Sequence, residues 1–296
     1  MMKNKKFYAA AGLVVLICAA AAGFYFSSLA YRLDRLAAGK DCRVGAAVIA
    51  GSRTFVHGEG KYPLLSVFKL FIAVQVLDKL ERENAVPCKT ELTITRDMID
   101  ERTYSPMRDE RRTYPYGISV VRLLEYMVAE SDNNAADILL AYAGGAEQTQ
   151  AYLNRLGFGG IEVSVNEREM NADIAKQYVN RASPADVVRF LKTVREGDIL
   201  TPENRKFFDK IMTATVTGGD KLKAGLPQGT VFGHKTGSSS RTAEGIKIAD
   251  NDAGFVILPD GRTYYIAVMV SDSRMSDREN AALAAEISAV VYNRLR

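Results

Sequence analysis

Histidine is scarce in this sequence, with His57 and His234 the only two among 296 residues. A zinc hydrolase usually takes several His or Cys ligands at close spacing, and no such cluster is present. A Ser-His-Asp triad would need one of the two histidines as its base. His234 stands directly before a lysine, and His57 lies in a predicted hairpin strand. The sequence therefore argues against zinc chemistry and against a serine nucleophile that is activated by a histidine base. We expect no metal or other cofactor.

Charge is absent from a long stretch near the N-terminus. Three lysines within residues 1–6 precede an uncharged apolar run from residue 7 to about residue 26. Small residues at positions 28 and 30 suit a signal peptidase, so we expect residues 1–30 to be a signal peptide that is cleaved after Ala30. The alternative is an uncleaved inner-membrane anchor, because the run is nearly long enough to span a bilayer. In both cases the rest of the chain is exported, and we expect a periplasmic protein.

The rest of the chain has little net charge. Removing residues 1–30 removes three lysines and no acid, so the formal charge falls from +4 to +1. A nucleic-acid-binding protein needs a concentrated basic face, and that class is excluded. We expect contact with a membrane only through the N-terminal segment, if it is uncleaved. The remaining length suits one compact domain or two interleaved subdomains, and we expect a monomer.

Cysteine is also rare, with three residues in the chain. Cys18 falls in the apolar N-terminal run, which leaves Cys42 and Cys88. Such a pair in an exported protein permits a disulfide. Two free thiols are the alternative, because a sequence does not show whether two cysteines are close in space.

Strand patterns occupy the two ends of the chain, and helical patterns occupy its middle. The predicted strands have mostly small, β-branched or alternating apolar residues, and they span residues 43–50, 54–57, 230–238, 253–258 and 263–271. The predicted helices have apolar residues every three or four positions, and they span residues 32–40, 67–80, 118–128, 133–142, 146–156, 183–195, 202–215 and 277–295. The segment 157–182 has no clean periodicity, and irregular connections of that length are usually functional or disordered.

This order of elements predicts an α/β fold of the α+β sandwich type. An antiparallel sheet built from both chain ends would be flanked by helices, with an all-helical subdomain beside it. The sheet subdomain would comprise residues 31–64 and 216–296, and the helical subdomain residues 65–215. Together they would form one catalytic domain over residues 31–296, with a cleft between the two parts.

Three short motifs lie in settings that suit catalysis. Ser66 and Lys69 form an S-x-x-K tetrad at the start of the long helix. One helical turn separates them, so the ammonium can reach the hydroxyl on the same face. A free serine is a poor nucleophile and needs a base, and a lysine can act as one if its pKa is lowered by burial or by a neighbouring cation such as Lys235. The helix start also presents N–H groups to a developing oxyanion.

The other two motifs complete this set. In Ser131-Asp132-Asn133, Ser131 can relay a proton to a leaving nitrogen, and Asn133 can bind a substrate amide and the lysine of the first motif. Lys235-Thr236-Gly237 lies on a predicted strand, where Lys235 and Thr236 can bind a substrate carboxylate. Gly237 permits a ligand close to the backbone, and the N–H of Ser238 can join that of Ser66 in an oxyanion hole.

From about Arg43 to the C-terminus, the chain resembles the class A serine β-lactamases, and the trio of motifs is typical of these enzymes and of penicillin-binding proteins. The irregular segment contains an E-x-E-x-N pattern that resembles the omega loop of the family. The resemblance implies that Glu167 activates the deacylating water and that Asn171 helps to hold this water. It also implies that Tyr104 lies at the mouth of the cleft. The forms S-V-F-K and H-K-T-G look most like the second subclass, which includes extended-spectrum cephalosporinases.

Two positions depart from the family pattern. Members commonly tie the omega loop with an Arg–Asp ion pair, whereas Val165 and Asn180 stand at the matching positions. An arginine that assists carboxylate binding is replaced by Lys221, and Arg274 is a second candidate for that role.

We therefore expect an enzyme that hydrolyses the β-lactam amide bond of penicillins and cephalosporins through a serine acyl-enzyme and confers resistance to them. The main alternative is a D-alanyl-D-alanine peptidase or transpeptidase, which would share the acylation step. A non-catalytic sensor that is acylated without turnover is a third reading. Glu167 argues against both alternatives.

Overall fold

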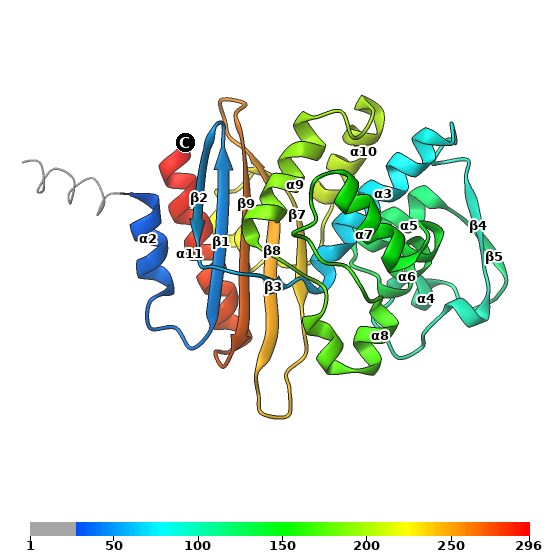
Figure 1. Ribbon diagram of the computed structural model, residues 1–296, viewed down its shortest axis with the longest axis horizontal. Coiled ribbons are helices and arrows are strands. Elements are labelled where there is room, and N and C mark those ends of the chain that lie inside the picture. Colours follow the sequence, from blue (N-terminus) through cyan, green and yellow to red (C-terminus); the bar gives the residue numbers. More distant parts are fainter. Residues whose placement is uncertain (1–27) are drawn as a thin grey trace, which may run out of the picture.

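The computed structural model describes residues 28–296 (Figure 1). Most of the predicted signal peptide or anchor lies outside the described residues. Among residues 28–296, every helix is too short or too polar to cross a membrane, and no group of three potential metal-ligating side chains is found.

One five-stranded sheet forms the centre of the molecule, and its strand order is β2-β1-β9-β8-β7. Every neighbouring pair in it is antiparallel, as expected. The five strands are β1 (Arg43–Ala50), β2 (Arg53–His57), β7 (Val231–Ser238), β8 (Lys247–Ile257) and β9 (Thr263–Ser273). The two ends of the chain thus build one sheet, and β7 is the edge that faces the helical part of the molecule (Figure 1).

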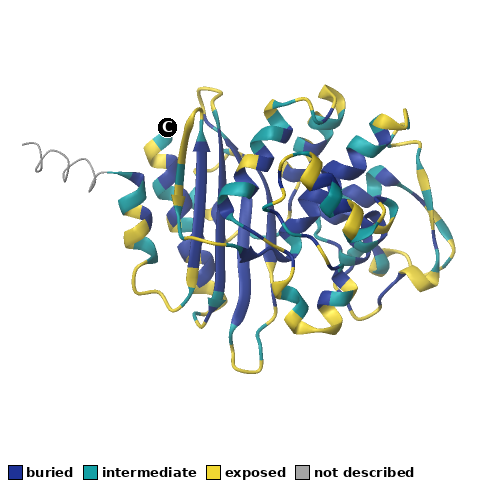
Figure 2. Ribbon diagram, in the orientation of Figure 1, coloured by how far each residue is buried: buried dark blue, intermediate teal, exposed yellow. Residues whose placement is uncertain are grey.

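Helices cover both faces of this sheet. On one face lie α2 (Leu29–Ala37) and α11 (Asp277–Leu295), whose apolar side chains pack on the outer residues of β1, β8 and β9. On the opposite face α9 (Pro184–Glu196) packs against β1 and β9. Figure 2 shows that β1, β9, β8 and β7 are buried along nearly their whole length, whereas the edge strand β2 is largely exposed. The division into subdomains 31–64 with 216–296 and 65–215 stays a prediction, and α9 is a helix of the second range that contacts strands of the first.

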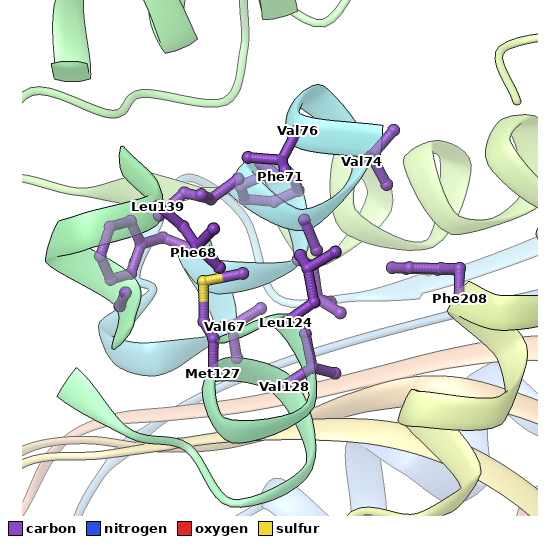
Figure 3. Close-up of a cluster of buried hydrophobic side chains, with 14 of the residues drawn as sticks. Val67, Phe68, Phe71, Val74, Val76, Leu124, Met127, Val128, Leu139 and Phe208 are labelled. Carbon is purple, nitrogen blue, oxygen red and sulfur yellow. The ribbon is translucent and has the colours of Figure 1, made fainter. Parts of the chain in front are cut away.

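The remaining helices form a group beside β7, with α3 (Lys69–Arg82) at its centre. Ten of the fourteen residues of α3 are buried, so this helix is apolar almost all round, as predicted. Figure 3 shows its side chains packed among those of the surrounding helices. Around it lie α4 (Pro106–Glu110), α5 (Val120–Ala129), α6 (Asn133–Tyr142), α7 (Gly145–Arg155), α8 (Glu167–Ala172) and α10 (Pro202–Thr213).

Short elements join these layers. The pairs β3 (Tyr62–Pro63) with β6 (Arg181–Ala182) and β4 (Glu91–Ile94) with β5 (Tyr116–Ser119) form two small sheets. Single 3-10 turns occur at η1 (Leu65–Phe68), η2 (Arg96–Met98), η3 (Ile174–Tyr178) and η4 (Leu222–Gly225). The first pair anchors the segment 157–182 to the chain just before the predicted nucleophile.

The structure corrects one expectation and decides between two alternatives that the sequence left open. The strand predicted at 253–258 begins at Lys247 instead, because the polar run Asp250-Asn251-Asp252 is buried and bonded to polar partners inside the protein. Cys42 and Cys88 are both free thiols, the first half-buried and the second exposed, so the disulfide is not formed.

Candidate active site

Ser66 lies at a sharp turn where the sheet meets the helical group. It belongs to η1, which runs directly into α3, and the preceding Leu65 has a positive φ of 46°. A leucine keeps this unfavourable conformation only where its surroundings hold it. Asn251 on β8 supplies part of that support, because its buried side-chain amide donates to the carbonyl oxygens of the two residues before Leu65, at 2.7 and 3.2 Å. The predicted nucleophile is therefore at the start of α3, on a rigid turn.

The strand β7 passes so close to this turn that only glycine fits. A Cβ atom at Gly237 would lie 2.4 Å from the carbonyl oxygen of Leu64 and 3.2 Å from the backbone nitrogen of Ser66. Ser66 and Ser238 line the same cavity as a result. This is the placement expected for two N–H donors of an oxyanion hole.

The ammonium of Lys69 is fully buried and surrounded by acceptors. Its Nζ donates to Oδ1 of Asn133 at 2.6 Å and to the carbonyl oxygen of Ser131 at 2.7 Å. It also lies 3.0 Å from Oε1 of Glu167. The hydroxyl of Ser66 donates to that same carboxylate oxygen at 3.4 Å. Glu167 thus stands between the nucleophile and the lysine.

The Ser131-Asp132-Asn133 motif connects α5 to α6. Ser131 has a positive φ of 61°, and its Oγ accepts a hydrogen bond from Nζ of Lys235 at 2.8 Å. Asp132 caps α6 by accepting from the backbone N–H of Ala135 at 2.8 Å, and burial raises the pKa of the Asp132 carboxyl. The same carboxylate accepts from the loop that bears Tyr104, at Ser105 Oγ and Met107 N. Asp132 therefore holds the start of α6 and the loop of Tyr104 together, and this fixes the positions of Ser131 and Asn133 on either side of it.

Lys235 is the second lysine of the site without exposed surface. Besides Ser131, its Nζ donates to the carbonyl oxygen of Thr236 at 2.9 Å. Burial, and then the positive charge of Lys69, lower the pKa of Lys235 well below its usual value. A lysine in this state gives up its proton more readily than an exposed lysine. The hydroxyl of Thr236 lies 2.6 Å from that of Thr217, which the motifs did not predict.

Two neighbouring glutamates, Glu167 and Glu169, have different contacts in the structure. Glu167 begins α8, and Asn166 caps this helix in a reciprocal pair of hydrogen bonds with Glu169. The carboxylate of Glu169 is engaged in that cap and in an ion pair with Lys176 at 3.2 Å. Asp137 accepts the backbone N–H groups of Glu167 and of the next residue, at 2.7 and 2.9 Å. Glu167 is therefore the one that faces the nucleophile.

An amide replaces the ion pair that the family commonly uses to close the omega loop. Asn180 is fully buried, and its Oδ1 accepts from the N–H groups of Ser164 and Val165 at 2.8 and 3.1 Å. Its Nδ2 donates to the carbonyl oxygen of Val165 at 2.8 Å. Its backbone oxygen accepts from the N–H of Leu64, two residues before the nucleophile, at 2.8 Å. The loop is thus tied to the turn that carries Ser66.

The two candidate cations for a substrate carboxylate differ in place. Lys221 lines the cavity, but its Nζ is already 2.5 Å from Oδ1 of Asp250. Arg274 is exposed just beyond β9 and is not among the residues that line the cavity. Tyr104 is 57% exposed and lines the cavity.

The predicted residues converge on one cleft made of two adjoining cavities of about 310 Å³ each. The lining includes nine of them: Ser66, Tyr104, Ser131, Asn133, Glu167, Asn171, Lys221, Thr236 and Ser238. A larger cavity of about 410 Å³ lies near α8 and is mostly apolar, with neither Ser66 nor either buried lysine in its lining. The chemistry therefore belongs to the cleft that Ser66 lines.

Sequence reasoning missed several supporting residues. Asp137, Asn251 and Asp250 belong to no short motif, and each acts on a segment distant in sequence. The only available signal was the polar run at 250–252 inside an otherwise apolar strand pattern.

Comparisons with known proteins agree with this geometry. The model of the "Beta-lactamase enzyme family" matches residues 28–295. A β-lactamase of Bacteroides uniformis is 41% identical over 273 residues, which cover 91% of this chain and 92% of that protein. The extended-spectrum β-lactamase PER-1 of Pseudomonas aeruginosa is 33% identical, with 88% of this chain and 85% of that protein covered.

Solved structures give the same result. A class A β-lactamase from Bacteroides cellulosilyticus superposes with a TM-score of 0.87 at 40% identity, and the match covers 90% of this chain and 96% of the other. The TLA-3 extended-spectrum β-lactamase has the same TM-score at 34% identity, and the match covers 90% of this chain and 98% of the other. With a family model over nearly all of the described residues and relatives above 30% identity along most of their length, the chain belongs to the class A β-lactamases.

Proposed function

We propose that this protein hydrolyses the β-lactam amide bond of penicillins and cephalosporins through a serine acyl-enzyme, and so confers resistance to them. The observation that carries the proposal is the position of Glu167, whose Oε1 lies 3.4 Å from Oγ of Ser66 and 3.0 Å from Nζ of Lys69. A carboxylate at this place can activate a water against the acyl-enzyme. A peptidase or a sensor needs no such group, so the position of Glu167 favours a hydrolase.

In acylation, Oγ of Ser66 attacks the β-lactam carbonyl carbon. Its proton goes to the base formed by Lys69 and Glu167, both of which lie beside it. The N–H groups of Ser66 and Ser238 are placed to stabilise the negative oxygen of the tetrahedral intermediate. The C–N bond then breaks, and the leaving nitrogen takes a proton from Ser131, which is hydrogen-bonded to Lys235 at 2.8 Å. The proton that left Ser66 then makes good the loss from the Ser131–Lys235 pair, so Glu167 is a carboxylate again before deacylation.

In deacylation, Glu167 takes a proton from a water, and the resulting hydroxide attacks the ester carbonyl. The ester bond breaks, and the proton that Glu167 took from the water returns to Oγ of Ser66 as the product leaves. General-base help of this kind is typically worth about 10²–10⁴-fold in rate. Asn171 lines the cavity beside Glu167 and is proposed to orient this water.

The remaining residues of the cleft are assigned to substrate binding. Thr236 and Ser238 face the cavity beside Lys235 and suit the carboxylate of the substrate. Asn133 suits the side-chain amide of the substrate, with its Oδ1 held by Lys69. Tyr104 offers a ring at the mouth of the cleft for an apolar substituent. Gly237 keeps the strand close enough for backbone contacts.

We also propose export to the periplasm, with a monomer as the working form. The apolar N-terminal run after three lysines supports export. A cleft to which residues of a single chain contribute every proposed group supports the monomer.

Mass spectrometry of acyl-enzymes tests the catalytic roles. After brief exposure to a penicillin, the parent and Glu167→Ala should each show a covalent adduct, and Ser66→Ala should show none. The adduct of Glu167→Ala should persist for minutes or longer. The matched control is Glu169→Ala, which should turn over nearly like the parent, because Glu169 is committed to the cap of α8. An adduct in Ser66→Ala, or parental turnover in Glu167→Ala, would contradict the assignment.

A further inference from the structure

Lys221, the lysine that lines the cleft, already has a counter-ion inside the protein. Nζ of Lys221 lies 2.5 Å from Oδ1 of Asp250, and the two side chains are only 9% and 3% exposed. The same ammonium donates to Oγ of Ser238 at 3.0 Å and lies 3.4 Å from the carbonyl oxygen of Asn251. Lys221 therefore has three acceptors before any substrate arrives.

The carboxylate of Asp250 also controls Ser238. Oγ of Ser238 donates to Oδ1 of Asp250 at 2.6 Å, so one carboxylate oxygen accepts from both neighbours. The two residues are directly opposite in the register of β7 and β8. Ser238 and Lys221 line the cleft, whereas Asp250 lies behind them and does not. Any action of Asp250 on a substrate must therefore pass through these two side chains.

Neighbouring charges do not replace Asp250 in this role. Asp252, two residues along β8, is paired with His234 at 2.8 Å. Asp220 lines the cleft as a second acid and is exposed. An incoming substrate carboxylate thus meets a lysine whose charge is neutralised at close range, and a negative charge behind it. Like charges brought close across a binding site weaken binding.

We propose that Asp250 is a positioning residue that holds Lys221 and Ser238 away from the substrate carboxylate and so limits how tightly carboxylate-bearing β-lactams bind. The inference rests on the proposed function, since it concerns the substrate of that same cleft. Asp250 acts as an internal competitor: when the substrate carboxylate binds, Lys221 and Ser238 must share or exchange their bonds with it. Removal of its charge should release one full positive charge toward the cleft.

The test compares Asp250→Asn with the parent on a chromogenic cephalosporin and on the methyl ester of the same compound. Asparagine has the same shape and can still accept from Ser238 or Lys221, but it carries no charge. For the free acid, we expect KM to fall and kcat/KM to rise by about three- to tenfold, with kcat within about twofold, because the gain is uniform binding. The ester lacks the carboxylate, so its kcat/KM should stay within about twofold of the parent value.

The double variant Lys221→Met/Asp250→Asn is the matched control. It should lose the gain for the free acid, because the charge that Asp250→Asn releases is no longer present. The double variant leaves no unpaired buried charge, so it can be measured even if Asp250→Asn alone folds poorly. In the double variant, kcat/KM for the free acid should stay at or below the parent value. A circular-dichroism melt checks that each variant is folded.

Three outcomes would overturn the inference. One is a folded Asp250→Asn enzyme whose ratio of kcat/KM for acid over ester is unchanged or lower. Another is an equal gain for the ester, which would indicate a general change in the cleft. The third is a gain that survives in the double variant. Failure of the proposed function is distinguishable, because the parent would then not turn over the free acid, whether or not an acyl-enzyme forms.

Discussion

At the scale of single residues, the two buried lysines of the site are stabilised in different ways. Lys69 has the carboxylate of Glu167 at 3.0 Å as well as two neutral acceptors. Lys235 has only neutral acceptors, the hydroxyl of Ser131 and a carbonyl oxygen, and its pKa is lowered. A buried ammonium without a counter-ion favours loss of its proton. Lys235 is therefore suited to feed protons to Ser131, and Lys69 is suited to hold Glu167 and Asn133 in place.

Asp137 is the residue for which pH matters most outside the catalytic set. Its carboxylate accepts the two N–H groups at the start of α8, and burial raises the pKa of Asp137 from 3.8 to about 6. Between about pH 4 and pH 6 the folded protein then keeps a proton that the unfolded chain has released. The stability contributed by this proton is fully present below pH 4 and is lost as pH rises through 6.

We therefore expect the free energy of unfolding of the parent, relative to Asp137→Asn, to fall between pH 4 and pH 7. A shift of two pKa units corresponds to a change of about 3 kcal/mol. Asparagine does not titrate, so the difference between the two proteins isolates this residue. Urea denaturation at several pH values measures it. A difference that stays flat, or that grows with pH, would contradict the raised pKa.

At the scale of elements, Asn180 closes the omega loop with three side-chain hydrogen bonds and no charge. Asn180→Ala should leave the buried N–H and carbonyl of Val165 and the part-buried N–H of Ser164 without partners, and should lower the free energy of unfolding by about 2–4 kcal/mol. Asn180→Asp is the matched variant. Its carboxylate can accept both N–H groups, but it faces the carbonyl oxygen of Val165 without a proton to donate, so it should also destabilise the protein at neutral pH. Denaturation of the three proteins in urea checks both. Parental stability of Asn180→Asp would show that the loop is held mainly by its two N–H donors.

The elements also show which parts of the fold could be predicted from the sequence. Regular apolar spacing gave α6 and α11 with their observed bounds, because a single buried face defines each helix. The nucleophile helix was expected at residue 67 and begins at Lys69, since the preceding turn is held in a 3-10 conformation by Asn251 from β8. The local spacing of apolar residues carries no information about a contact from a strand that is distant in sequence.

The candidate site shows the same limit. The residues that do the proposed chemistry form short motifs, so they were found. Those that position them, such as Asp137 behind Glu167 and Asp250 behind Lys221, contact segments about 30 residues away, and no local pattern marks them. The role expected of Lys221 requires that its ammonium be free to bind a substrate carboxylate. Whether it is free depends on the position of Asp250, which the sequence does not show. The sequence shows that Val165 and Asn180 depart from the family pattern. The hydrogen bonds of the Asn180 side chain that replace the ion pair are visible only in the structure.

At the scale of the whole molecule, the cleft exists because the two ends of the chain meet in one sheet. The strands β1 and β2 come before the nucleophile, and β7 to β9 come from the last quarter of the chain. The turn that bears Ser66 is held from β8 by Asn251 and touched from β7 at Gly237. The catalytic geometry therefore depends on the sheet being complete, including the outer layer of α2 and α11 that covers its far face.

This dependence makes the start of α2 important. Ser28 caps α2, and its Oγ accepts from the N–H of Tyr31 at 3.2 Å. Leu29 is only 2% exposed, in the core shared with α11 and the sheet. Cleavage after Ala30, as expected from the sequence, would remove both the cap and this buried side chain. It would also leave a positive amino group at the first turn of the helix, where the helix dipole disfavours it.

We therefore expect a chain that begins at Tyr31 to be less stable than one that begins at Ser28. Loss of the cap costs about 1 kcal/mol and loss of a buried leucine about 2 kcal/mol, so the free energy of unfolding should fall by about 3 kcal/mol. Urea denaturation of the two chains measures this, and Ser28→Ala in the longer chain isolates the cap. If the two chains are equally stable, α2 does not support the sheet in this way. The intact mass of the exported protein then shows where the natural cleavage site lies. A protein that begins at or before Ser28 would keep α2 complete. The sheet, and through it the turn of Ser66, depends on this outer layer.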